Sequence, residues 1–137
     1  MHFDLVDAVV DSGESRIVTL KHVSNAEEYL LDHFPGYPVL PGVMMIEALV
    51  QAARRLLDPD DRADPPWVLG AVRGLKYGAF VRPGSTLRVE VSRHKGGEGA
   101  VEFKGEAVLI EPGADPSGTS ADPKVAVSGR FVMRRAV

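Results

Sequence analysis

The sequence predicts an α+β domain in which one long helix packs against an antiparallel sheet. Three observations support this fold class: a single long helical segment, several segments with strand character around it, and short turns between consecutive strands. Strands joined by short turns pair antiparallel, because a parallel pair needs a long crossover connection. The chain has 137 residues, the length of one globular domain, so we expect a single domain over residues 1–137.

The helical segment begins at Gly42, continues to Leu57 and consists of strong helix formers with no Gly or Pro after its first residue. Pro41 suits the first position of a helix, where its missing N–H costs nothing. Asp58 and Pro59 end the segment. Its polar residues form one narrow stripe at helical spacing, namely Glu47, Gln51, Arg54 and Arg55. Since the rest of the circumference is apolar, we expect other structure to surround the helix almost completely.

The segments with strand character are Arg16–Leu20, Trp67–Tyr77, Thr86–Val91, Ala100–Ile110 and Lys124–Met133. Residues 86–91 alternate apolar and polar side chains, as a strand with one buried face does. The glycine-rich residues 96–99 predict a hairpin turn. Pro, Gly, Ser and Asp are frequent at about 111–122, which indicates a mobile loop before the last strand.

Composition excludes several classes of function. The formal net charge is −3, from 16 Lys and Arg against 19 Asp and Glu, so no basic field marks a nucleic-acid-binding protein. The chain has no cysteine, which excludes disulfides, thiolate catalysis and cysteine-rich zinc sites. No apolar run is long enough to span a bilayer, and the first residues do not resemble a secretory signal. We therefore expect a cytoplasmic protein without a nucleic-acid or membrane partner.

His33 is the first candidate for a catalytic residue. It lies in residues 32–43, where three prolines and two glycines impose an irregular backbone that leads into the helix. Rigid turns on both sides of an imidazole hold the ring at a defined angle, as a general base requires. The alternative is a structural loop whose histidine only caps or packs, and the residues alone favour neither interpretation.

The helix supplies two more candidates. Burial of Glu47 within the first two turns would favour the protonated carboxyl, which can donate a proton; the alternative is a solvated or ion-paired helix edge. The Gly42 N–H has no acceptor within the helix and lies at the positive end of the helix dipole. Glycine lets a carbonyl approach that N–H closely, although an ordinary helix start has the same residues.

The run HFPGYPVLPGVMMIEALVQ, residues 33–51, closely resembles the signature of the β-hydroxyacyl-acyl carrier protein dehydratases of the FabZ type. That signature has the form H-F-P-G-x-P-x-x-P-G-V, followed by a helix with E-A-x-x-Q. His33 and Glu47 are 14 positions apart, which is the family's separation of its two catalytic groups. The residues at 3–7 and 74–84 resemble further elements of the family. The family usually has glycine before the histidine, where this chain has Asp32.

The resemblance implies the hotdog fold, a curved antiparallel β-sheet wrapped around one long central α-helix. It also implies a homodimer or higher homo-oligomer with shared active sites, and dehydration of (3R)-hydroxyacyl-acyl carrier protein to the trans-2-enoyl product without a metal or redox cofactor. His33 would remove the α-proton, and Glu47 of the other subunit would help expel the 3-hydroxyl. The Gly42 N–H would hold the thioester carbonyl, and Gln51 would orient the carboxylate.

The carrier, an acidic protein, would need basic docking residues, and the candidates are Arg54, Arg55, Arg73, Lys76 and Arg82. Residues that could limit acyl chain length are Met44, Met45, Leu49 and Phe80, with plain core packing as the alternative. A non-catalytic hotdog protein that binds acyl thioesters, or a heterodimer partner, is the alternative from another class. A dehydratase that also isomerises the double bond and a thioesterase fit the motif less well, because the former carries Asp in place of Glu47 and the latter usually lacks the histidine.

Overall fold

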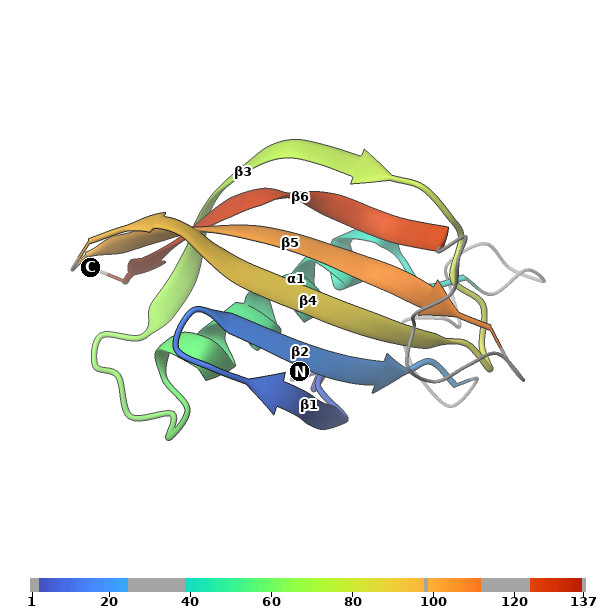
Figure 1. The fold of residues 1–137 in the computed structure, drawn as a ribbon, viewed down its shortest axis with the longest axis horizontal. Helices are drawn as coiled ribbons and strands as arrows, with labels where there is room; N and C mark the ends of the chain where they lie inside the picture. Colours follow the sequence, from blue (N-terminus) through green and yellow to red (C-terminus); the bar gives the residue numbers. More distant parts are fainter. Residues whose placement is uncertain (1–2, 25–38, 98, 112–123, 137) are drawn as a thin grey trace.

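A computed structural model describes residues 3–24, 39–97, 99–111 and 124–136. Along the chain its elements are β1 (Ala8–Ser12), β2 (Arg16–His22), α1 (Gly42–Leu57), β3 (Trp67–Tyr77), β4 (Thr86–Gly96), β5 (Ala100–Ile110) and β6 (Lys124–Arg135) (Figure 1). The predicted helix and all five predicted strands are present in the structure. Strand β1 was not predicted, because all five of its residues are exposed and no alternation marks it. The candidate His33, its neighbour Asp32 and the predicted loop beyond residue 111 lie outside the described residues.

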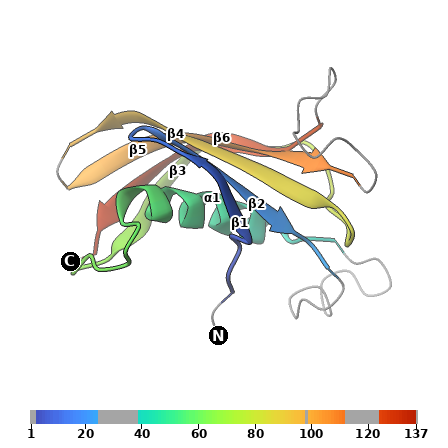
Figure 2. The same cartoon turned by 60° about the horizontal axis from the view of Figure 1, so that its bottom comes forward.

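The strands form one six-stranded sheet in the order β1-β2-β4-β5-β6-β3. All neighbouring pairs are antiparallel, as predicted. The order does not follow the chain, since β3 joins the far edge of the sheet beside β6 rather than lying next to β2. The reason is visible in Figure 2, where α1 lies across one face of the curved sheet. The chain therefore leaves the sheet at β2, crosses under it and returns at the opposite edge.

The hydrophobic core lies between this face of the sheet and the helix. The predicted alternation of β4 is confirmed, since Leu87, Val89 and Val91 are fully buried. On the next two strands Phe103 and Phe131 are directly opposite, and their rings stack with centroids 5.6 Å apart. At Gly105 an added Cβ would lie 3.1 Å from the Phe131 ring and 3.3 Å from the Leu49 side chain. This glycine therefore lets the helix pack closely against the sheet.

The described residues do not cover the helix completely. Val43 is 69% exposed, and Met44 and Ile46 are only partly buried, so the described residues leave part of the first helical turns uncovered. Its N-cap is Pro41, which has a non-helical ψ of 142°, and Gly42 is the first helical residue. No helix in the described part of the chain is both long and apolar enough to cross a membrane.

Candidate active site

Gln51 and Glu47 form a hydrogen-bonded pair on one side of α1. Because they are four residues apart, their side chains lie one above the other on the helix surface. Gln51 Nε2 donates to Glu47 Oε1 at 3.2 Å and to the Phe3 carbonyl at 2.7 Å, while Gln51 Oε1 accepts from the Leu5 N–H at 2.7 Å. A backbone N–H can only donate, so the amide must place its NH₂ group toward Glu47. The structure thus brings these two predicted site residues into contact and orients one oxygen of the half-buried carboxylate.

The N-terminal segment holds Gln51 in place. The side chain of Leu5 is fully buried in the core, and Asp4 Oδ1 accepts from the Val6 N–H at 3.0 Å, which fixes the backbone of the segment. Sequence reasoning identified residues 3–7 only as part of a resemblance and assigned them no function. No local pattern would have shown their contact with the helix, because it joins residues 46 and 48 positions apart.

Gly42 lies on a different side of the helix, where it lines an apolar cavity of about 450 Å³. That volume is within the range of small-molecule sites. The lining residues are Val39, Leu40, Gly42, Met45, Tyr77, Gly78, Ala79 and Phe80. Within the described residues, the Gly42 N–H donates to no backbone carbonyl, as expected at the first residue of a helix. The cavity therefore combines apolar walls with a helix N-terminus.

Two of the four candidate chain-length residues line this cavity. Met45 and Phe80 contribute to its wall, Met45 from the helix and Phe80 from the segment after β3. Leu49, which is 1% exposed, packs into the core against the sheet instead, and Met44 does not line the cavity. The core-packing interpretation is therefore the correct one for Leu49.

Glu47 does not line the cavity that contains Gly42. Five residues separate them, which places their directions about 140° apart around an α-helix. A group bound over the Gly42 N–H therefore does not face the Glu47 carboxylate of the same helix. Within the described residues, one chain holds both groups but does not combine them in one cavity.

A single long helix lying across a curved antiparallel sheet defines proteins of the hotdog class. The fold matches a chain of the dehydratase heterocomplex ApeI:P from Xenorhabdus doucetiae with a TM-score of 0.66 and 18% identity, over 98% of this chain and 100% of that one. A thioesterase superfamily member from Thermus thermophilus matches with a TM-score of 0.64 and 18% identity, over 91% and 84%. These structural likenesses show the fold alone, and they confirm the predicted hotdog fold.

Sequence similarity identifies the family within the hotdog class. Residues 9–110 match the ApeI-like family, described as ApeI dehydratase. The 3-hydroxyacyl-[acyl-carrier-protein] dehydratase FabZ of Pediococcus pentosaceus is 43% identical over 105 residues, which cover 74% of this chain and 69% of that protein. The FabZ of Clostridium perfringens is 34% identical over 133 residues, 96% of this chain and 86% of that protein. This chain therefore belongs to the FabZ and ApeI family of hotdog dehydratases, as its motif predicted.

Proposed function

We propose that this protein removes water from (3R)-hydroxyacyl thioesters of an acyl carrier protein and forms the trans-2-enoyl thioester. It would act as a hydro-lyase in fatty-acid or related acyl biosynthesis, within a single domain over residues 1–137. Membership of the dehydratase family supports the reaction. The structural observation that carries the proposal is the Glu47 carboxylate held by Gln51, on the same helix whose N-terminus lines an apolar cavity.

Each candidate residue would carry out one part of the reaction. His33 accepts the α-proton as the Cα–H bond breaks, and the developing charge on the thioester oxygen is stabilised by the Gly42 N–H. The double bond then forms as the Cβ–oxygen bond breaks. Glu47 supplies a proton to the departing hydroxyl, which leaves as water. The thioester itself acidifies the α-carbon, so the chemistry assigns no step to a metal or redox group.

We propose that two copies of the chain share each site. The side of the molecule near the Gly42 cavity exposes large apolar residues, since Val43 and Phe80 are each 69% exposed and Tyr77 is 51% exposed. Strand β3 is an edge strand of the sheet and exposes Leu69 and Val72 as well. A second copy on this side would remove these apolar groups from water. It would also bring a second helix, whose Glu47 can face the cavity that the first chain's Glu47 does not reach.

The proposed reaction has a direct test. Purified protein is mixed with 3-hydroxyacyl-carrier substrates of several chain lengths, and formation of the conjugated enoyl thioester is followed by its ultraviolet absorbance. We expect the absorbance to rise with at least one chain length, and the reverse hydration to occur when the enoyl product is supplied. No reaction in either direction with any chain length would contradict the proposal.

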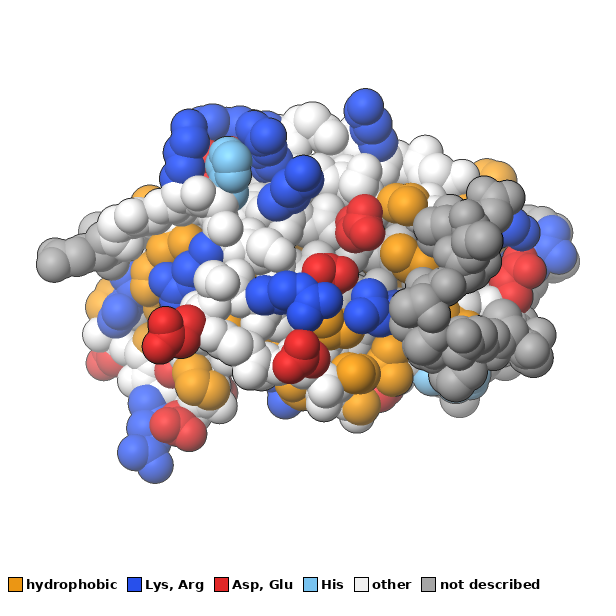
Figure 3. Space-filling view, in the orientation of Figure 1, with side chains coloured by type: hydrophobic (Ala, Val, Ile, Leu, Met, Phe, Trp, Pro, Cys, Tyr) orange, Lys and Arg blue, Asp and Glu red, His pale blue; other side chains and the backbone are white. Residues whose placement is uncertain are grey.

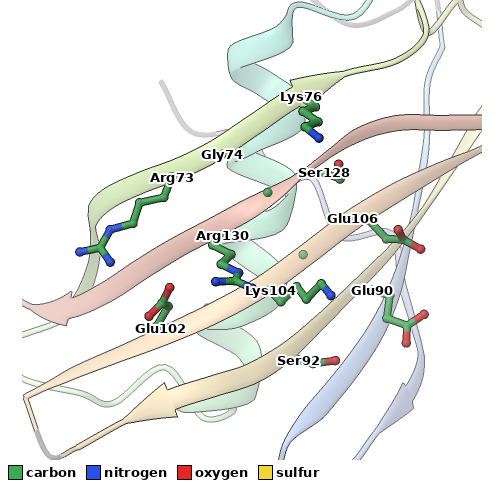
Figure 4. A pocket seen from close by; sticks show the side chains of 12 residues that line it. Arg73, Gly74, Lys76, Glu90, Ser92, Glu102, Lys104, Glu106, Ser128 and Arg130 are labelled. Atoms are coloured by element: carbon green, nitrogen blue, oxygen red, sulfur yellow. The ribbon is translucent and has the colours of Figure 1, made fainter.

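Four of the five candidate docking residues for an acidic carrier fall into two separate groups. Arg54 and Arg55 line a hollow at the C-terminal end of the helix. Arg73 and Lys76 line another hollow, of about 670 Å³, on the outer face of the sheet (Figure 4). Figure 3 shows that basic and acidic side chains both occur on this outer face. The candidates therefore do not form one continuous patch.

The outer hollow contains a row of basic residues. Arg73, Arg130 and Lys104 are directly opposite one another on β3, β6 and β5. Like charges in this arrangement are destabilising unless an anion binds there. Among the acids of the hollow, Glu90 accepts from Arg16 Nε at 2.6 Å, and this pairing lowers the pKa of Glu90 below its usual value. Glu102 and Glu106 also line the hollow, so only part of the positive charge of the row remains for an acidic partner.

Of the residues in this hollow, Lys76 is the nearest along the chain to the proposed active site. It directly precedes Tyr77, which lines the Gly42 cavity. Consecutive strand residues face opposite sides of a sheet, so the two sites lie on opposite faces at the same end of β3. We expect Lys76→Glu to raise KM about fivefold for carrier-bound substrate through charge repulsion and to leave KM unchanged for a small-molecule thioester. Steady-state kinetics at low salt measures both values.

The matched control is Arg55→Glu, the same charge reversal in the other group. It is expected to leave both KM values unchanged. If Arg55→Glu raises KM for the carrier-bound substrate and Lys76→Glu does not, the carrier docks at the end of the helix and the outer hollow is not its surface.

Gln51→Leu tests the role of Gln51. Leucine has a similar volume but provides no donor for Glu47 and no partners for the Phe3 carbonyl or the Leu5 N–H. We expect kcat to fall about tenfold, as for other residues that orient a catalytic group, and the free energy of unfolding to fall by about 1–2 kcal/mol. Enzyme kinetics at a temperature where the variant is folded, together with urea denaturation, separates the two effects. A fall in stability with an unchanged kcat would make Gln51 purely structural.

A further inference from the structure

The phenol ring of Tyr77 lies directly over Gly42. A Cβ atom added to Gly42 would lie 2.8 Å from the ring carbon that bears the hydroxyl and 2.9 Å from the hydroxyl oxygen. Real Cβ atoms do not make such short contacts, so any other residue at this position would displace the ring. Glycine at the helix N-terminus therefore has a function beyond ligand access: it allows a tyrosine hydroxyl to lie beside the first N–H group of the helix.

The distance from the hydroxyl to that N–H can be bounded. A Cβ position lies about 2.5 Å from its own backbone nitrogen, so a hydroxyl 2.9 Å from the Cβ position is at most about 5.4 Å from the Gly42 nitrogen. Two donors that share one oxygen at about 2.9 Å each are at most about 5.8 Å apart. A single carbonyl oxygen placed between them is therefore within hydrogen-bond distance of both donors.

The Tyr77 hydroxyl is available for such a bond. No hydrogen bond joins it to any of the described residues, and the side chain both lines the cavity and is 51% exposed. The backbone on either side is held firmly: Tyr77 is in register with Val127 on β6, and the Gly78 N–H donates to the Ala126 carbonyl at 2.9 Å. A Cβ at Gly78 would collide with the Val125 carbonyl oxygen, so the backbone after β3 packs closely against β6.

We propose that the Tyr77 hydroxyl is a second donor to the thioester carbonyl, and that it works with the Gly42 N–H as a two-donor oxyanion site. This inference rests on the proposed function and adds a catalytic residue to it. When the α-proton leaves, negative charge moves onto the carbonyl oxygen, and two fixed donors stabilise that charge better than one. The phenol can donate without itself carrying a charge.

Tyr77→Phe tests this role, because it removes the hydroxyl and keeps the ring that walls the cavity. We expect kcat to fall about 10- to 100-fold, the low part of the range for such a donor because the residue is half-exposed. KM should rise by a smaller factor than kcat falls, since the bond strengthens as charge develops. A wild-type kcat in this variant would overturn the proposal.

A binding measurement tests the same bond without turnover. Two unreactive substrate analogues are compared by calorimetry, one with a ketone in place of the thioester and one with a methylene group there. The wild-type protein should bind the ketone more tightly than the methylene analogue. In Tyr77→Phe the ratio of the two dissociation constants should be at least threefold smaller. Phe80→Leu is the control, because Phe80 lines the same cavity but its side chain has no hydrogen-bond donor, so the binding of both analogues should weaken together.

These measurements separate the two proposals. A wild-type protein that shows no turnover but a ketone preference dependent on Tyr77 would overturn the dehydration and support the two-donor site. A wild-type protein that turns over substrate, with an identical ketone preference in Tyr77→Phe, would support the dehydration and make Tyr77 only a wall of the cavity.

Discussion

Glu47→Gln is expected to lower kcat by about 10³-fold, within the range for loss of a general acid. The substitution keeps the size of the side chain, and its carbonyl oxygen can still accept from Gln51 Nε2, which lies 3.2 Å from the carboxylate. The ties between Gln51 and the N-terminal segment therefore remain, and the melting temperature should stay close to that of the wild type. What is lost is the proton for the departing hydroxyl. Enoyl absorbance and thermal unfolding measure the two quantities.

The control for this variant is Glu14→Gln, the same chemical change at an exposed position in the turn between β1 and β2. It should retain the wild-type rate. If Glu47→Gln also retains it, the carboxylate has no catalytic role, and the hydrogen bond to Gln51 is only part of the packing between the helix and the N-terminal segment.

His33→Ala should lower kcat by a similar factor, on the order of 10²- to 10⁴-fold, because no other group is assigned to the α-proton. A mixing experiment with Glu47→Gln then tests whether sites are shared between subunits. When the two inactive variants are unfolded together and refolded, half of the dimers should contain one copy of each. If each site combines His33 of one subunit with Glu47 of the other, every such dimer has one intact site, and about a quarter of the wild-type activity returns.

Sites formed within one chain predict a different result for the mixture. If both residues of a site came from the same chain, each site of the mixed dimer would lack one of them and no activity would return. Refolded wild-type protein gives the reference activity, and refolding each variant alone shows that neither recovers by itself. Native mass of the mixture confirms that chains have associated.

Much of the fold was predictable because its signals are local. Thr86–Val91 alternates because one face of β4 is buried, and that alternation is visible in six consecutive letters. The helix was predictable from residues 42–57, which lack any interior helix breaker. Strand β1 was not, because its five residues are all exposed and its pairing with β2 comes from backbone hydrogen bonds rather than side-chain pattern.

The sequence by itself determined the fold class, the family and the identity of the candidate catalytic groups, because a motif of contiguous residues carries all three. The tertiary structure alone decided how those groups are supported. Gln51 meets Phe3 and Leu5 only because the N-terminal segment folds back along the helix. Tyr77 lies over Gly42 only because α1 crosses the sheet and delivers the chain to its far edge. Such contacts join residues distant along the chain, and they arise from packing of the whole domain rather than from any local preference.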